Sequence, residues 1–538
     1  MNQLYYGDNL DILKRYIKDE SVDLIYLDPP FNSNATYNVL FSQQNGSQSS
    51  AQIQAFEDTW QWDENAALNF ELSVERGGAV ADTLRAFRML LGNSNMMAYL
   101  AMMAPRLLEL HRVLQDTGSL YLHCDPTASH YLRILLDTIF GGENFKNEII
   151  WKRTSAHSAA NKYGAIHDTI LFYTKSNNFT WNVQYQPYDQ EYIDRFFDTT
   201  DEDGRKYKRS DLTGAGTTNG PSGEPWRGRD VRARGRHWMY VPSMLDELDE
   251  QGRIHWPKKE GGMPRLKQYP EDLPGLPIQD IWTDIRPIHN LSEERLGYPT
   301  QKPEELLDRI IKASSNEGEI ILDPFCGCGT AIASAQKNNR NWIGIDITHL
   351  AIGLIKIRMA DQFGEELIYE VYGEPTTIEG AQELADMDKF QFEWWALGLV
   401  GARPADPKKG ADRGIDGRLF FHDDDSGKTK QVIISVKGGH TGVSHIRDLV
   451  GVLDRENAQI GVLLTLQEPT QPMRSEAASA GFYDSPWGKH PRVQILTIEE
   501  LLDGKQIDMP PIRQVNQTYR RAPKHKGDEG KQLGLLDD

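Results

Sequence analysis

The stretch DLIYLDPPF, residues 23–31, places a carboxylate, two prolines and an aromatic ring directly after a short apolar run. Residues 24–27 are mostly apolar and, with Val22, are typical of a strand buried in a sheet. Asp28 follows that strand, where a carboxylate without a partner is costly. A strand followed by a capped turn would explain the prolines, but not the acid, the prolines and the ring together. We therefore predict a ligand site at Asp28.

The whole chain is too long for one hydrophobic core. It has 538 residues, of which 39% are hydrophobic, so we expect two or three globular domains. Its first residues lack the pattern of a secretion signal, and its longest apolar window is about half of a membrane span. A cytoplasmic protein is expected, associated with the nucleoid if it binds DNA. Three cysteines fit a reducing compartment, and the spacing of Cys326 and Cys328 with His123 does not fit a zinc site.

Positive charge is concentrated in one segment, although the net charge of −19 argues against nucleic acid on its own. Between Arg205 and Arg236, nine Lys or Arg stand against three acids, and Trp226 and Trp238 are interleaved with them. Guanidinium groups bind phosphates and indoles stack on bases, so we predict a DNA contact here. The arginines that carry this prediction are Arg227, Arg229, Arg232, Arg234 and Arg236. The alternative is a solvated loop whose arginines pair with the acidic remainder of the chain.

A glycine-rich loop, ILDPFCGCGT at residues 321–330, joins a predicted strand to a predicted helix. Its glycines let a ligand approach the helix N-terminus closely. Asp323 would repel the pyrophosphate of a dinucleotide but attract an ammonium group. Asp346 stands 23 residues later, at the end of the next strand, where an acid can accept hydrogen bonds from ribose hydroxyls. A ligand with an ammonium group and a ribose describes S-adenosylmethionine.

The residues after the first strand suit chemistry on a nucleobase amine, which is a poor nucleophile because its lone pair is delocalised. A site must accept hydrogen bonds from that amine as its nitrogen becomes tetrahedral. Asp28 can accept one such bond and a proline carbonyl can accept another. Phe31 can stack on a base that has left the duplex.

Together, LDPPF, TQKP (residues 300–303), LDPFCGCGT and GIDI (residues 344–347) resemble the β-group of DNA amino-methyltransferases, in which the catalytic half precedes the cofactor half. The resemblance covers residues 4–360 and is nearest to the modification subunits of type III restriction systems and their solitary relatives. It implies methyl transfer from S-adenosylmethionine to adenine N6 in double-stranded DNA, in restriction–modification or phage defence. Cytosine N4 enzymes more often carry serine in place of Asp28. Protein-glutamine methyltransferases are also similar, but usually carry asparagine there and lack an insert.

The same resemblance assigns roles to residues. Catalysis would involve Asp28, Pro29, Pro30 and Phe31. Cofactor contacts would come from Asp8, Lys302, Asp323, Phe325, Gly327, Gly329 and Asp346. A homodimer and a separate restriction subunit are partners compatible with such an enzyme.

We expect an α/β fold with a permuted Rossmann-like sheet, an inserted target-recognition region and a smaller α/β domain. The expected boundaries are residues 1–175 for the catalytic half, 176–298 for the insert, 299–375 for the cofactor half, 386–510 for the smaller domain and 511–538 for a flexible tail.

Residues 412–437 of the smaller domain resemble the Mrr-like branch of PD-(D/E)xK restriction endonucleases. The resemblance places Asp416 and Lys437 in the motif, with Asp416 as a ligand of Mg²⁺. Ser435 stands where the family carries a metal-binding Glu or Gln, and Glu393 is a candidate replacement. Whether the domain cleaves DNA or is an inactive DNA-binding relative stays open. A DNA-binding protein with two decayed domains is the non-enzymatic alternative, against which the intact motifs of the first domain argue.

The last residues, KQLGLLDD at 531–538, resemble the short peptide with which bacterial proteins bind the replication sliding clamp. Three leucines amid charges have no core of their own to pack into, and a groove on a partner would supply one. Gln532 would set the register by hydrogen bonds. The alternative is that the leucines pack on the smaller domain or have no role.

Overall fold

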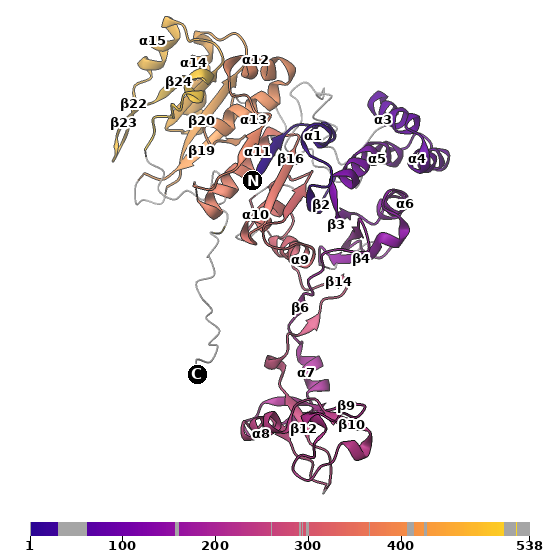
Figure 1. The fold of residues 1–538 in the computed structure, drawn as a ribbon. Coiled ribbons are helices and arrows are strands. Elements are labelled where there is room, and N and C mark those ends of the chain that lie inside the picture. The colour runs from indigo at the N-terminus through magenta and orange to yellow at the C-terminus, as the bar shows by residue number, and fades with distance from the viewer. Residues whose placement is uncertain are drawn as a thin grey trace. The chain divides into compact units, whose positions relative to one another are not determined.

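The computed structural model describes residues 2–30, 62–155, 161–259, 261–289, 301–364, 366–405, 414–423 and 428–510, together with residues 292, 294–296, 298 and 523. The chain divides into two compact units (Figure 1). One unit comprises Met1–Asn182 and Asp280–Asp538, and the other comprises Val183–Gln279. The second unit lies within the expected insert of residues 176–298.

The first unit is built on a nine-stranded sheet in the order β14-β4-β5-β3-β2-β15-β16-β1-β17. The strands from β3 to β17 in that order are parallel, and β5 is antiparallel to both of its neighbours. The strands are β1 (Gln3–Tyr6), β2 (Val22–Leu27), β3 (Leu114–Cys124), β4 (Phe145–Lys152), β5 (His167–Thr174), β14 (Ile281–Trp282), β15 (Ile320–Asp323), β16 (Asn341–Asp346) and β17 (Glu370–Tyr372). This mixed sheet with flanking helices confirms the predicted α/β class.

The centre of the sheet joins the two halves of the sequence. Strand β2 pairs in parallel with β15, with Leu24 opposite Ile321 and Ile25 opposite Leu322. All four side chains are fully buried, as expected for strands covered on both faces. Nearly 300 residues separate these neighbours in the chain. The catalytic and cofactor halves meet along this pair of strands and along β1, which pairs with β16 and β17.

Helices cover the sheet with apolar surfaces. Helix α5 is apolar around most of its circumference, which is typical of a buried helix, and Figure 1 shows it grouped with α3 and α4. Helix α1 is capped by the Asp8 carboxylate, which accepts hydrogen bonds from the amides of Leu10 and Asp11. The helices are α1 (Asn9–Tyr16), α3 (Glu64–Glu75), α4 (Gly78–Leu91), α5 (Asn95–Val113), α6 (Ser129–Phe140), α9 (Glu304–Ser314), α10 (Thr330–Lys337) and α11 (His349–Phe363), with a 3₁₀ turn at Gly142–Asn144.

The second unit has a small core of its own. Trp226, Trp238, Leu245 and Ile254 are among its buried side chains, and short strands and turns surround them. Its elements are β6 (Tyr185–Gln186), α7 (Gln190–Phe196), β7 (Thr199–Thr200), β8 (Lys206–Asp211), β9 (Thr213–Ala215), β10 (Arg236–Trp238), α8 (Pro242–Glu250), β11 (Ile254–His255), β12 (Arg265–Gln268) and β13 (Leu276–Pro277), with 3₁₀ turns at Pro221–Gly223, Arg232–Arg234 and Pro270–Asp272.

The C-terminal part of the first unit has a separate five-stranded sheet in the order β18-β19-β20-β21-β24. Apolar clusters lie on both of its faces, one with α12, α13 and α16 and the other with α14 and α15. The elements are α12 (Ile378–Met387), α13 (Lys389–Leu399), β18 (Arg403–Pro404), β19 (Gly417–Phe421), β20 (Lys430–Lys437), α14 (Val443–Glu456), β21 (Ile460–Thr465), α15 (Gln471–Ser479), β22 (Phe482–Ser485), β23 (Gly488–Pro491), β24 (Val493–Thr497) and α16 (Ile498–Leu502). This arrangement fits the predicted smaller α/β domain.

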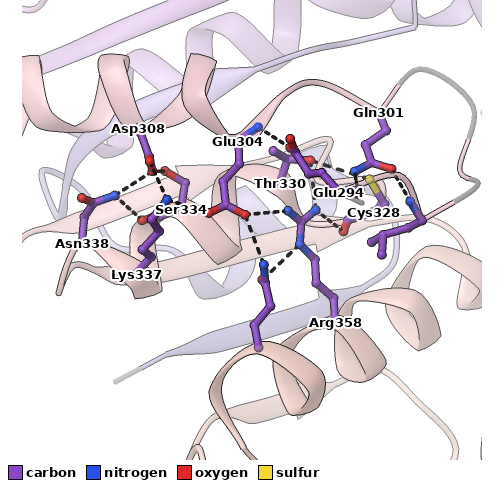
Figure 2. A network of polar contacts seen from close by, with 12 residues as sticks. Glu294, Gln301, Glu304, Asp308, Cys328, Thr330, Ser334, Lys337, Asn338 and Arg358 are labelled. Atoms are coloured by element: carbon purple, nitrogen blue, oxygen red, sulfur yellow. Dashed lines mark hydrogen bonds and ion pairs between the residues drawn. The ribbon is translucent and has the colours of Figure 1, made fainter. Parts of the chain in front are cut away.

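A buried polar network fixes the helices behind the glycine-rich loop (Figure 2). The Arg358 side chain is 1% exposed and pairs with Glu304 Oε2 at 3.1 Å. It also donates to the carbonyl of Cys328 at 3.3 Å and to Thr330 Oγ1 at 3.1 Å. Lys337 forms a second ion pair with Glu304 at 2.9 Å. The network therefore ties α9, α10 and α11 to the loop through charges that satisfy one another.

Replacing Arg358 with leucine should lower the free energy of unfolding by about 3 kcal/mol, because Glu304 would lose a charged partner in a buried position. Differential scanning calorimetry of the full chain measures this loss. Arg15→Leu is the matched control, since Arg15 is 67% exposed and its pair with Asp11 is worth less than about 1 kcal/mol. Equal losses in the two variants would contradict a stabilising role for the network.

Candidate functional site

Three predicted acidic residues meet at one edge of the sheet. Asp28 directly follows β2, Asp323 ends β15 and Asp346 ends β16, and these three strands are adjacent and parallel. Ligands of parallel α/β sheets bind at the carboxyl ends of the strands, next to points where the strand order reverses. The structure thus brings together carboxylates that are far apart in the sequence, since 318 positions separate Asp28 from Asp346.

Asp28 forms an ion pair with Lys302, whose Nζ contacts Asp28 Oδ2. The two side chains are 18% and 11% exposed, so the pair is largely shielded from solvent. Pro29 is buried and Pro30 is half-buried, which fixes the backbone after the acid. Lys302 was predicted as a cofactor contact, and the structure places it against the predicted catalytic acid. Phe31 lies outside the described residues.

The glycine-rich loop wraps around the end of β15. Asp323 accepts a hydrogen bond from the amide of Phe325 at 3.0 Å, and the amide of Gly327 donates to Asp346 Oδ2 at 2.9 Å. Gly329 has φ +74°, and a Cβ there would lie 2.8 Å from Ile355 Cγ1. Glycine is therefore required at this position, both for its conformation and for its size.

Burial raises the pKa of Asp346 to about 6, although Gly327 and Thr348 donate hydrogen bonds to it. Burial also raises the pKa of Asp323 well above its ordinary value, and the carboxylates of Asp28 and Asp346 add to the effect. Lys302 acts in the opposite direction but does not offset these contributions. A cationic ligand would stabilise both carboxylates in their charged form. The chemistry of this edge therefore fits the ammonium and ribose ends of S-adenosylmethionine.

Asp8 is held by a residue that the sequence reasoning missed. Arg106 Nη2 pairs with Asp8 Oδ2 at 2.6 Å, and its Nε donates to Asn9 Oδ1 at 2.6 Å. Arg106 lies in the apolar helix α5 and is buried. Arg358 is a second buried arginine, on α11. The sequence signal that could have identified Arg106 is a charge directly after the uncharged run of residues 95–105, whereas Arg358 stands near Lys356 and Asp361 and has no such signal.

A second polar cluster that the sequence reasoning missed links β2, β3 and β5, near the end of β2 that precedes Asp28. Tyr26 Oη and His123 Nδ1 are 2.9 Å apart, and His123 Nε2 is 3.2 Å from Asp168 Oδ2. All three side chains are buried, and Arg153 pairs with the other oxygen of Asp168 at 3.3 Å. His123 therefore has polar partners within the sheet, from β2 and β5.

Three of the five arginines in the basic segment have hydrogen-bond or ion-pair partners within the unit, and the other two do not form ion pairs in the described chain. Arg227 pairs with Asp246 and Asp249, Arg229 donates to the carbonyl of Gly262, and Arg236 donates to Thr213. These three side chains therefore have structural partners inside the unit. Arg232 and Arg234 are exposed on a 3₁₀ turn, without an ion pair to another residue of the described chain.

The predicted stacking of Trp226 and Trp238 on bases is wrong in this structure. The two residues are 3% and 0% exposed, and their rings pack edge to face at 5.7 Å. Trp238 Nε1 donates to the carbonyl of Glu224 at 3.0 Å, so its polar atom is also satisfied internally. The mixture of arginines and tryptophans reflects a small core with a charged rim.

The nuclease-like residues come together in the C-terminal sheet. Asp416 Oδ2 accepts hydrogen bonds from Ser435 Oγ at 3.0 Å, the amide of Val436 at 2.6 Å and Lys437 Nζ at 3.1 Å. Glu393 is half-buried on α13. In the described part of the chain, no group of three His, Cys, Asp or Glu side chains could hold a metal ion. The predicted Mg²⁺ site around Asp416 and Glu393 thus finds no ligand cluster there.

Two further expectations concern the C-terminal tail and membrane spans. The residues predicted to bind the sliding clamp, including Gln532, lie outside the described residues. Of the helices that the structure describes, none combines the length and the hydropathy that crossing a membrane requires.

Curated relatives of this chain are DNA-modifying enzymes by name. The type II methyltransferase M.EcaI of Enterobacter cloacae is 36% identical over 49% of this chain and 58% of its own length. The Mod subunit of the type III restriction-modification enzyme StyLTI of Salmonella typhimurium is 26% identical over 63% and 50%. The DNA adenine methyltransferase YhdJ of Escherichia coli is 24% identical over 72% and 92%. The chain thus spans about half the length of the first two relatives and most of the third.

Two family models match separate segments. Residues 390–503 match the family described as NACHT-associated inactive restriction endonuclease 1. This match corrects the Mrr-like assignment of the C-terminal domain, and Ser435 in place of an acidic or amide ligand agrees with the word inactive. Residues 22–356, more than half of the chain, match the model described as DNA methylase, which covers N6 and N4 amino-methyltransferases. The chain belongs to the DNA methylase family.

Proposed function

We propose that this chain transfers a methyl group from S-adenosylmethionine to N6 of adenine in DNA. The observation that carries the proposal is the position of Asp28-Pro29-Pro30 at the end of β2, beside Asp323 and Asp346 at the ends of the next two strands. The acceptor amine and the methyl donor would thereby be bound at one edge of one sheet. The names of the relatives, which include an adenine methyltransferase and a type III modification subunit, support the same substrate class.

The cofactor would be held by the glycine-rich loop and the acids around it. Asp323 would take its ammonium group and Asp346 its ribose hydroxyls, with Phe325, Gly327 and Gly329 forming the wall between them. The cofactor supplies an electrophilic methyl group on a sulfonium ion. Asp8, which Arg106 holds at the start of α1, remains a proposed contact at one end of this site.

The residues after β2 would orient the acceptor amine. The Asp28 carboxylate and the carbonyl of Pro29 would accept its two hydrogen bonds, which strengthen as the nitrogen becomes tetrahedral. Lys302 holds the Asp28 carboxylate in place. Phe31 would stack on the flipped base. Lys302 thus acts in this proposal on the catalytic acid, and its proposed contact with the cofactor is secondary.

Cytosine N4 is the second candidate acceptor, because the matched family includes both N6 and N4 enzymes. The aspartate at position 28 favours adenine. Incubation of DNA with the chain and isotope-labelled S-adenosylmethionine, followed by mass spectrometry of the nucleosides, separates the two. Labelled N6-methyldeoxyadenosine is the expected product, and labelled N4-methyldeoxycytidine would select the alternative.

The second unit would bind the target DNA through its exposed arginines, Arg232 and Arg234. The C-terminal domain would be a nuclease-like domain that does not cleave DNA, because Ser435 replaces a metal-binding residue and the matched family is described as inactive. A homodimer, a separate restriction subunit, the sliding clamp and association with the nucleoid stay predictions from the sequence.

Asp28→Ala should abolish methyl transfer while changing the affinity for S-adenosylmethionine by no more than several-fold, because Asp28 would contact the base. Asp346→Ala should weaken cofactor binding by about 1–3 kcal/mol, the cost of leaving polar groups without partners. Isothermal titration calorimetry and a methyl-transfer assay measure the two effects. Equal loss of cofactor affinity in both variants would refute this division of roles.

The double variant Arg232→Ala with Arg234→Ala should weaken DNA binding and reduce the slope of log affinity against log salt by about 1.8, as two phosphate contacts are lost. Fluorescence anisotropy at several salt concentrations measures the slope. Arg205→Ala with Arg209→Ala is the matched control, because both arginines are exposed and already paired with Asp203 and Asp198. A slope equal to that of the wild type in the first variant would place DNA binding elsewhere.

The wild-type chain should leave unmethylated DNA uncut with Mg²⁺ or Mn²⁺, in the presence and in the absence of S-adenosylmethionine. Gel electrophoresis of supercoiled plasmid detects a single nick per molecule. Cleavage that Lys437→Ala or Asp416→Ala removes would show that the domain is an active nuclease and would contradict the proposal.

A further inference from the structure

The C-terminal domain contacts the cofactor half beside Asp346. Gln391 lies in the first turn of α13 and is 4% exposed. Its Oε1 accepts a hydrogen bond from the amide of His349 at 2.9 Å, and its Nε2 donates to the carbonyl of Ile347 at 3.3 Å. Gln391 belongs to the segment that matches the inactive-nuclease family, whereas Ile347 and His349 belong to the methylase segment. The side chain of Gln391 therefore connects the two segments that match different families.

The two bonds of Gln391 bracket Thr348, the residue that holds Asp346. The Thr348 amide donates to Asp346 Oδ1 at 3.0 Å, and the Thr348 hydroxyl donates to the same oxygen at 2.9 Å. Thr348 is fully buried and also caps α11 through the amide of Ala351. The peptide groups on both sides of Thr348 are thus fixed by Gln391, and Thr348 fixes the carboxylate.

The side chain of Gln391 is itself held rigidly. The Asp388 carboxylate caps α13 and accepts hydrogen bonds from the amides of Phe390 at 2.9 Å and Gln391 at 3.1 Å. Helix α13 packs against α11, whose first residue, His349, stacks on Tyr6 at 3.6 Å. A capped helix end on a packed helix can position an amide as precisely as a strand can.

Resting on the proposed role of Asp346 in cofactor binding, we propose that Gln391 is a positioning residue for S-adenosylmethionine and that the nuclease-like domain serves the methyltransferase by completing its cofactor site. Without Gln391, the amide of His349 and the carbonyl of Ile347 would be buried without these partners. The turn of residues 347–349 would then change its conformation to satisfy these groups, and the Asp346 carboxylate would lose the fixed orientation that Thr348 gives it. The domain thus contributes to methyl transfer without chemistry of its own.

The test uses the full chain and three substitutions of one residue. Gln391→Ala removes both bonds and leaves space, and Gln391→Leu removes both bonds but keeps the volume. Gln391→Glu can still accept from the amide of His349 but cannot donate to Ile347. Gln382→Ala is the matched control, because the Gln382 amide on α12 is exposed and bonded to Asp386 at 2.9 Å.

Calorimetric titration with S-adenosylmethionine should give a dissociation constant about tenfold higher for Gln391→Ala and Gln391→Leu, the equivalent of one buried hydrogen bond, and no change for Gln382→Ala. Steady-state assays should show the same increase in KM for the cofactor with kcat largely retained. Affinity equal to that of the wild type in Gln391→Leu would overturn the proposal, because packing alone would then suffice.

Hydrogen exchange of the His349 amide provides a readout that does not depend on activity. Exchange should be faster in Gln391→Leu than in Gln391→Glu, which keeps an acceptor for that amide, and unchanged exchange in both would overturn the proposal. If the wild type fails to bind S-adenosylmethionine, the proposed function itself fails. If the wild type binds it and all variants at position 391 bind equally, the positioning role alone fails.

Discussion

The parallel pairing of β2 with β15 is the constraint on which the site depends. Leu24 and Ile25 on one strand pair with Ile321 and Leu322 on the other, all fully buried, so a shift in register would disrupt apolar packing on both faces of the sheet. With this register fixed, the ends of β2, β15 and β16 present their carboxylates along one edge. The cost of that arrangement is electrostatic, since burial and the neighbouring carboxylates of Asp28 and Asp346 raise the pKa of Asp323 well above its ordinary value.

The surrounding structure limits this cost with buried cations. Lys302 contacts Asp28, Arg106 contacts Asp8, and Arg358 braces the loop between the acids from behind. Each cation comes from a different element, so the charge balance also links α5, α11 and the segment before α9 to the sheet edge. Removing Lys302 would leave the largely shielded Asp28 carboxylate with less compensation, and removing Arg358 would do the same to Glu304 behind the loop.

Much of the site could be predicted from the sequence because its motifs are local. Asp28, Asp323 and Asp346 each end an apolar run, and such runs identify strands and their carboxyl ends. The contacts of Arg358 and Gln391 could not be predicted, because their partners lie on other elements and no short pattern records them. Trp226 and Trp238 show a further limit: aromatic rings among arginines have the same sequence signature in a DNA-binding surface and in a small core with a charged rim. Their burial decides between the two.

The second unit begins and ends with two short strands that pair with each other. Strands β6 and β13 pair antiparallel, with Gln186 opposite Leu276 and Tyr185 opposite Pro277, so the first and last turns of the unit are held together by its own hydrogen bonds. A segment whose first and last strands pair with each other in this way is a self-contained insert. If the unit recognises the target as proposed, recombination between genomes can exchange it for another of different length and sequence while the parent sheet keeps its register, and target specificity then changes without any change to the residues at the strand ends.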